Sequence, residues 1–85
     1  MNIKIIKVTP VDNYKLMVEF DNGIVKQYDM SKLFYLDAFK PLENKFLFKQ
    51  ARADTFGHGV IWNDEIDISE YEIWTNGTDI KHETK

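Results

Sequence analysis

"YKLMVEFDNGIVKQYDM", residues 14–30, decides the fold, because it holds two alternating segments on either side of a short turn. Side chains two residues apart lie on the same face of a β-strand. In the first segment this spacing gathers the apolar side chains on one face, and they are Tyr14, Leu16, Val18 and Phe20. The pattern predicts a strand with one buried face.

The turn determines how the second segment, residues 24–30, pairs with the first. A three-residue loop, Asp21 to Gly23, places Leu16 opposite Tyr28, so that the apolar residues of both strands share one face. A two-residue loop would move Tyr28 to the solvent face. We therefore predict the three-residue loop, in which Gly23 supplies the positive φ required at the last position.

The flanking segments extend this hairpin into a covered sheet. Residues 3–11 are rich in β-branched side chains and include Pro10, which suits a strand end or an edge strand because it lacks an N–H donor. A three-stranded antiparallel meander is the expected result. Ser31 is placed to cap one short helical turn, and Pro41 with Asn44 introduces a second. The apolar residues of this region that are expected to cover the sheet are Phe39, Leu42, Phe46 and Phe48.

The second half of the chain predicts a smaller β-unit and one helix. Residues 51–56 and 59–62 are typical of two strands joined around Gly57 to Gly59, and residues 65–69 of one more extended piece. Ser69 with Glu72 has the spacing of a capping box, in which each side chain accepts from a backbone N–H near the helix start.

A short helix should therefore follow Ser69, and Ile68 with Ile73 has the spacing of its hydrophobic staple. We expect an α+β fold of two layers, in which the antiparallel β-meander and a second β-hairpin pack against short helices. The single domain should span residues 1–74. Residues 75–85 are polar and aperiodic, which predicts a flexible tail.

Composition narrows the functional classes. The 85 residues are 44% apolar, suit one core, and contain no cysteine, so disulfides and thiolate chemistry are excluded. No segment of about 18 consecutive apolar residues and no signal-type start is present, so we expect a cytoplasmic protein without membrane contact. The net charge is −3, yet residues 1–53 carry nine basic against six acidic residues, whereas residues 54–85 carry two against eight. Such a dipolar chain could steer a charged partner.

The segment "GHGVIWNDEIDIS", residues 57–69, holds the only concentration of chemically active side chains. His58 has no histidine nearby, since the other one is His82. A calcium loop counted from Asn63 would need glycine and glutamate where Ile68 and Trp74 stand. We therefore expect no metal and no cofactor. Trp62 and the two glycines are interpreted as folding residues, and His58 as the tip of a hairpin.

The sequence gives only weak support for nucleophilic catalysis or for nucleic-acid binding. The two serines, Ser31 and Ser69, are better explained as helix caps than as nucleophiles. Lysines are scattered along the chain, and Arg52 is the single arginine, the residue most used to contact bases. The chain alone is therefore not expected to bind nucleic acid specifically.

Together, these residues resemble the small bacterial domain-of-unknown-function 2442 family over roughly residues 7–74. The matching positions are Val8, Pro10, Leu16, Phe20, Gly23, Asp29, Phe39, Leu42, Phe46 and the segment at residues 57–69. The resemblance implies an α+β domain with no assigned activity and no catalytic residues. Relatives are often small free-standing proteins, some beside other small proteins and some joined to a helix-turn-helix. This context implies an interaction or regulatory module, of toxin–antitoxin type.

We expect a non-enzymatic protein-interaction or regulatory module with a protein partner of unknown identity. The residues expected to contact that partner are His58, Asn63, Asp64, Glu65, Asp67 and Glu70. Four of them lie in an acidic segment, residues 64–72, that carries five carboxylates and no basic residue. The alternative is an unrecognised enzyme that uses the same segment, with Asp64 and Asp67 as an acid and base pair. The sequence leaves open whether the chain forms a homo-oligomer.

Overall fold

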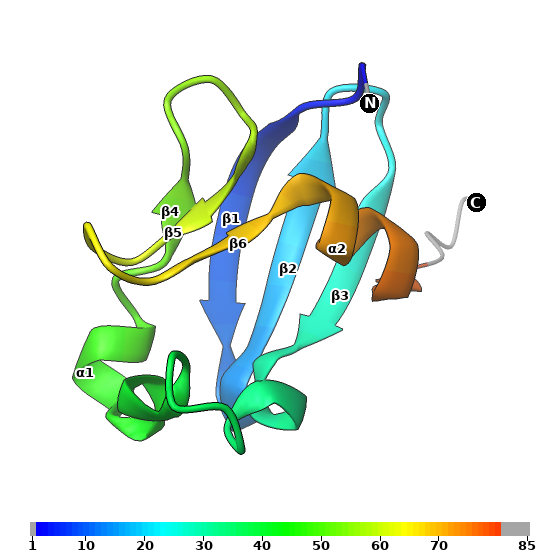
Figure 1. Cartoon of the computed structure of the whole chain (residues 1–85). Helices are drawn as coiled ribbons and strands as arrows, with labels where there is room; N and C mark the ends of the chain where they lie inside the picture. The colour runs from blue at the N-terminus through cyan, green and yellow to red at the C-terminus, as the bar shows by residue number, and fades with distance from the viewer. Residues whose placement is uncertain (1, 81–85) are drawn as a thin grey trace.

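The computed structural model describes residues 2–80 and contains two antiparallel sheets. The larger sheet has four strands in the order β1-β2-β3-β7 (Figure 1). Its strands are β1 (Ile5–Val11), β2 (Lys15–Phe20), β3 (Val25–Asp29) and β7 (Thr78–Asp79). The expected three-stranded meander is confirmed, with β1 at the edge where Pro10 needs no N–H.

The hairpin register follows the alternating pattern. Leu16 pairs with Tyr28, and the Phe20 backbone N–H donates to the Ile24 carbonyl at 2.9 Å. Gly23 has a φ of +88°, which completes the predicted three-residue loop. β2 begins at Lys15, one residue later than the alternation indicates, because Tyr14 belongs to the turn between β1 and β2.

The smaller sheet lies in front of the larger one in Figure 1 and has the order β4-β5-β6. Its strands are β4 (Arg52–Ala53), β5 (Gly59–Ile61) and β6 (Asp67–Ser69). The predicted second hairpin is therefore confirmed, and the extended piece at residues 65–69 contributes the third strand. The α+β assignment holds, since short helices complete the layer that covers the larger sheet.

The helices are all short. The 3-10 helices are η1 (Asp12–Tyr14), η2 (Met30–Leu33) and η3 (Lys40–Glu43), and the α-helices are α1 (Lys45–Phe48) and α2 (Glu70–Asn76). None of the helices within residues 2–80 is long and apolar enough to cross a membrane.

One apolar core lies between the two layers. Its most deeply buried members are Leu16, Val18, Phe20, Tyr28, Met30, Leu42, Val60 and Ile73. Trp62 is also a core residue, as predicted, with only 3% of its surface exposed. Its Nε1–H donates to the Phe48 carbonyl at 3.0 Å, so the indole joins the end of β5 to α1 and leaves no buried donor unpaired.

The prediction that four apolar residues at positions 39–48 cover the sheet is wrong for Phe46. Leu42 and Phe48 are buried and Phe39 packs against the core, but Phe46 is 84% exposed. Successive helical residues are separated by about 100°, so side chains two positions apart point in nearly opposite directions. Once Phe48 faces the core from α1, Phe46 must face solvent.

The cap of η2 also differs from the prediction. The helix begins two residues earlier than a Ser31 cap would place it, and Asp29 is its N-cap. One carboxylate oxygen of Asp29 accepts from the Ser31 backbone N–H at 3.0 Å and from the Ser31 hydroxyl at 2.6 Å. Aspartate accepts this bond as well as serine does, so the first suitable side chain became the cap. The second cap is as predicted, since Asn44 Oδ1 accepts from the Leu47 N–H at 3.1 Å.

The ordered chain continues beyond residue 74, where we expected the polar tail to begin. α2 ends at Asn76, and Thr78–Asp79 forms β7 against Lys26 and Gln27 of β3. Lys26 Nζ lies 2.6 Å from Asp79 Oδ1 and 4.6 Å above the centroid of the Trp74 ring. A polar segment is thus held by backbone pairing and one ion pair, neither of which needs hydrophobic periodicity. Residues 81–85 of the expected tail lie outside the described part.

The glycines on either side of His58 allow backbones to approach closely. A Cβ on Gly57 would stand 2.8 Å from the Ile5 carbonyl oxygen, and a Cβ on Gly59 would stand 2.5 Å from the Ile68 carbonyl oxygen. Both distances are too short for a real side chain. These glycines therefore allow the β4–β5 loop to pack against β1 and β6, consistent with a role in folding.

Candidate functional site

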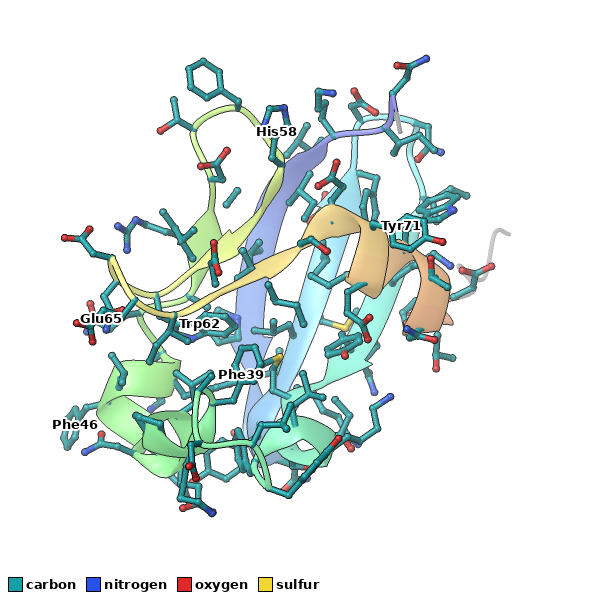
Figure 2. All side chains as sticks on the ribbon, in the orientation of Figure 1. Phe39, Phe46, His58, Trp62, Glu65 and Tyr71 are labelled. Atoms are coloured by element: carbon teal, nitrogen blue, oxygen red, sulfur yellow. The ribbon has the colours of Figure 1, made fainter. Side chains whose placement is uncertain are left out.

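The β5–β6 hairpin carries the six residues expected to contact a partner, but it divides them between its two ends. The Glu70 N–H donates to the His58 carbonyl at 3.0 Å, so these two residues are neighbours where β5 begins. Asn63, Asp64 and Glu65 form the turn at the opposite end, beyond the pair Ile61 and Asp67. Figure 2 shows His58 and Glu65 on separate parts of the surface.

The acidic turn is rigidly organised by Asn63. Its Oδ1 accepts from the Glu65 N–H at 2.8 Å and from the Ile66 N–H at 2.9 Å. The Trp62 N–H donates to the Ile66 carbonyl at 3.0 Å and closes the loop. Such bonds from an asparagine side chain to nearby backbone stabilise turns. The carboxylates of Asp64 and Glu65 are consequently left exposed on a fixed backbone.

No ion pair within residues 2–80 joins these carboxylates to a cation, although the Arg52 guanidinium lies nearby and donates to the Trp62 carbonyl at 3.3 Å. Within residues 2–80 the ion pairs are Lys7 with Glu19 and Lys26 with Asp79. Asp64, Glu65 and Asp67 therefore have no cationic partner in this part of the chain. Three exposed carboxylates near one guanidinium leave this end of the hairpin with an excess of negative charge.

A groove of about 520 Å³ adjoins the acidic turn. Pro41, Leu47 and Trp62 contribute to its walls, and the exposed ring of Phe46 stands at its side. Trp62 lines the groove and directly precedes the acidic turn, and Figure 2 shows Phe46 and Glu65 on the same side of the molecule. Sequence reasoning placed Phe46 in the core, although its spacing from Phe48 could have indicated exposure.

The other end of the hairpin presents a second, separate tip. Asp54 Oδ2 accepts from the Phe56 N–H at 3.0 Å and from the His58 N–H at 3.4 Å, which fixes the loop. Phe56 is 72% exposed, and its ring centroid lies 6.1 Å from that of His58. Among residues 2–80 no three histidine or carboxylate side chains are grouped to hold a metal ion. His82 lies outside the described residues.

Glu72 is the member of the acidic segment with an internal role. The prediction that its carboxylate caps the start of α2 is wrong, although Ser69 Oγ accepts from the Glu72 N–H at 3.1 Å as expected. Glu72 Oε2 instead accepts from the Tyr28 hydroxyl at 2.8 Å and from Asn76 Nδ2 at 2.9 Å. Burial, together with this hydrogen bond and the nearby charge of Glu72, raises the pKa of Tyr28 above its ordinary value.

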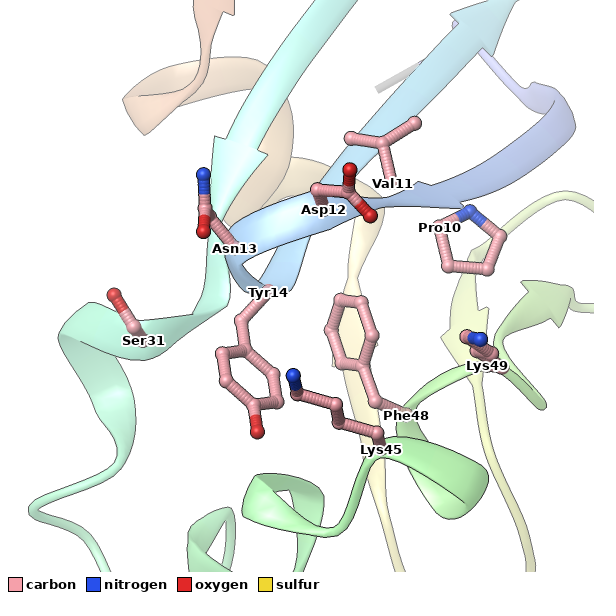
Figure 3. Close-up of a pocket in the computed structure, with 9 residues that line it drawn as sticks. All are labelled: Pro10, Val11, Asp12, Asn13, Tyr14, Ser31, Lys45, Phe48 and Lys49. Carbon is pink, nitrogen blue, oxygen red and sulfur yellow. The ribbon is translucent and has the colours of Figure 1, made fainter.

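A second cavity, of about 550 Å³, lies between the β1–β2 turn and α1 (Figure 3). Tyr14 and Phe48 line it with their rings, and Lys45 and Lys49 line it from α1. Asn13 and Tyr14 have φ values of 65° and 61°, a conformation that hairpin turns usually give to Asn and Gly. A tyrosine there costs roughly 1–3 kcal/mol of backbone strain. Alternation in the sequence assigned Tyr14 to a strand and gave no signal of this cavity.

The contacts of the Tyr14 side chain explain why a tyrosine occupies this strained position in the turn. It packs edge-on against Phe34 at 5.1 Å and Phe48 at 5.3 Å, and its hydroxyl donates to the Glu43 carbonyl at 2.6 Å. Packing of the ring joins the β1–β2 turn to η2, η3 and α1. This arrangement offsets the strain and forms one wall of the cavity.

Comparison with known proteins places the chain in a family without assigning an activity. No curated protein and no solved structure matches it. The model of a family described as "Protein of unknown function (DUF2442)" matches residues 5–79, which include β1 through β7. This match covers both sheets and most of the chain, and the protein therefore belongs to the DUF2442 family.

Proposed function

We propose that the chain is a protein-interaction module that binds a basic segment of a partner protein at the groove beside Phe46. The observation that carries this proposal is the 84% exposure of Phe46 next to a groove and an acidic turn. Transfer of a phenylalanine side chain from water into an interface is favourable by about 1.5–3 kcal/mol. Aromatic anchors that enter or flank pockets often dominate the energy of interfaces.

The groove gives the proposed partner a place for an apolar side chain. Its walls include Pro41, Leu47 and the edge of Trp62. Trp62 is held in place by its hydrogen bond to the Phe48 carbonyl, so this wall needs no rearrangement before binding. Preorganisation of this kind lowers the entropic cost of association.

The acidic turn selects the charge of the partner. Asp64 and Glu65 extend from a backbone that Asn63 fixes, and neither has a cationic partner within residues 2–80. A lysine or arginine beside the partner's apolar anchor would complement them. Complementary charge at the edge of an interface increases association rates and excludes wrong partners.

A binding role rather than catalysis is supported by the hydrogen bonds that the serine hydroxyls and the Asn63 amide make to the protein itself. The Ser69 hydroxyl accepts a bond at the start of α2, the Ser31 hydroxyl donates to Asp29, and the Asn63 amide fixes its turn. Each of these bonds stabilises local backbone. The hydroxyl groups that nucleophilic chemistry would recruit are thus engaged in folding, whereas the exposed carboxylates of Asp64 and Asp67 remain the basis of the alternative, acid–base chemistry.

Site-specific crosslinking in the native host tests the proposal. A photoreactive benzoylphenylalanine replaces Phe46 in one version and Phe56 in the other, which is equally accessible but lies at the opposite end of the hairpin. We expect position 46 to capture a lysine- or arginine-rich segment of one protein. Because the family resemblance suggests a regulatory pair, small proteins encoded beside this one are the first to examine.

Charge variants show whether the capture is specific. Asp64→Asn with Glu65→Gln should abolish the crosslink, whereas Asp12→Asn with Asp37→Asn, which removes the same charge from residues that do not line the groove, should preserve it. Identical products from positions 46 and 56, or a crosslink that survives loss of the acidic turn, would contradict the proposal. His58→Ala and Glu70→Gln then show whether the contact extends along the hairpin to its other end.

A further inference from the structure

We propose that the cavity between the β1–β2 turn and α1 binds a small organic anion with a flat apolar body. Its volume of about 550 Å³ falls within the range of about 300–1,000 Å³ that small-molecule sites occupy. The cavity is distinct from the groove beside Phe46. Lys45 and Lys49 of the α1 region line the cavity, whereas Phe46 and Leu47 line the groove.

The apolar part of the ligand is matched by aromatic walls. Tyr14 and Phe48 meet at a ring-centroid distance of 5.3 Å and an interplanar angle of 78°. Figure 3 shows both rings and Lys45 facing the same space, with Pro10 and Val11 nearby on β1. The Tyr14 ring is fixed by its hydroxyl bond to the Glu43 carbonyl at 2.6 Å. These surfaces favour a planar apolar group.

The charged residues that line the cavity, called its rim below, are Lys45, Lys49 and Asp12, and they favour a negatively charged ligand. Lys45 and Lys49 are four residues apart, so their side chains start from the same side of the helical turn. No ion pair joins either ammonium group to a carboxylate within residues 2–80. Among residues 2–80, Asp12 is the one acidic residue that lines the cavity, so two positive charges outweigh one negative charge in this part of the chain.

The turn adds an uncharged donor to the lining of the cavity, on the side of Tyr14 away from Lys45 (Figure 3). Asn13 lines the cavity, and its side-chain amide makes no hydrogen bond within the described residues 2–80. A carboxylate, sulfonate or phosphate placed between the ammonium groups would accept hydrogen bonds from Lys45 and Lys49. Charge-assisted hydrogen bonds of this type are stronger than neutral ones.

A pair of fluorescent dyes separates the charged from the apolar contribution. Anilinonaphthalenesulfonate carries a flat apolar body and one negative charge, and phenylnaphthylamine has a similar body without the charge. We expect the full chain to bind the sulfonate more tightly. Backbone amide chemical shifts should change chiefly at residues 11–14 and 45–49, which surround the cavity.

Substitutions on the rim should move the affinity in opposite directions. Lys45→Gln with Lys49→Gln should weaken binding of the sulfonate by about tenfold or more and leave that of phenylnaphthylamine unchanged. Asp12→Asn removes a like charge and should strengthen binding of the sulfonate by about two- to fivefold. Lys7→Gln with Lys40→Gln removes the same net charge away from the cavity and serves as the matched control.

Three results would overturn the proposal. They are equal affinity for the two dyes, amide shifts centred away from the cavity, and an equal loss of affinity in the control pair of lysine variants. Dispersed amide spectra of every variant verify that the domain remains folded, so that lost binding reports on the cavity itself.

Discussion

The Tyr28 hydroxyl donates a 2.8 Å hydrogen bond to Glu72, which fastens the first turn of α2 to the middle of the larger sheet. Tyr28 is 1% exposed, and Leu16, which pairs with it on β2, is fully buried in the core. A carboxylate that the local sequence assigns to its own helix is instead used for tertiary packing. Two predictions concern this contact.

Tyr28→Phe should lower the free energy of unfolding by about 1.5–3 kcal/mol, because the bond to a charged acceptor is lost while the ring remains. Urea denaturation measures the change. Tyr71→Phe, which removes a phenol that is 63% exposed, is the matched control and should stay within about 0.5 kcal/mol of the parent. Equal stability of the parent and Tyr28→Phe would show that the bond contributes nothing.

Alkaline pH should destabilise the domain through the same residue. The folded state raises the pKa of Tyr28, so above pH of about 10 the unfolded chain releases a proton that the folded chain retains. The contribution of Tyr28 is therefore fully present below that pH and is lost as pH rises further, by up to about 1.4 kcal/mol per pH unit. Denaturation at a series of alkaline pH values should give a shallower decline for Tyr28→Phe than for Tyr71→Phe.

Trp62→Ala should cost about 3–5 kcal/mol, because it empties a core position and leaves the Phe48 carbonyl without its donor. His58→Ala should change stability by less than about 0.5 kcal/mol, since within residues 2–80 only the backbone of His58 makes hydrogen bonds. Chemical denaturation of both variants, and of the parent with zinc or with a chelator, measures these effects. A destabilised His58→Ala protein, or a midpoint that responds to the metal, would indicate a metal site.

Tyr14→Gly should destabilise the domain even though it relieves a strained backbone. Relief is worth roughly 1–3 kcal/mol, whereas removal of an aromatic ring that packs on two others costs roughly 3–5 kcal/mol. Subtraction of these ranges gives a net loss centred on about 2 kcal/mol, within a range of about 0–4 kcal/mol. Asn13→Gly, at the neighbouring position of positive φ, tests the backbone alone and should be nearly neutral. Stabilisation by Tyr14→Gly would mean that the ring contributes little.

Parts of the candidate interaction surface could be predicted from the sequence and parts could not. Asp64 and Glu65 were expected on the surface because they follow a strand at a polar turn, and they are exposed. Phe46 was assigned to the core on its hydrophobicity, although a helix cannot direct both Phe46 and Phe48 inward. Proximity of Phe46 to the acidic turn depends on how α1 meets Trp62, which no local pattern records.

The sequence by itself determined the elements whose signals are local. Period-two alternation and Gly23 set the register of β2 and β3, Ser69 marked the start of α2, and the size and spacing of Trp62 placed it in the core. Only the tertiary structure decided that Glu72 bonds to Tyr28, that β7 pairs with β3, and that α1 separates a groove from a cavity. The physical reason is that these contacts join segments distant in the chain. Their geometry is set by how the two layers pack around the shared core, whereas alternation and capping depend on residues only a few positions apart.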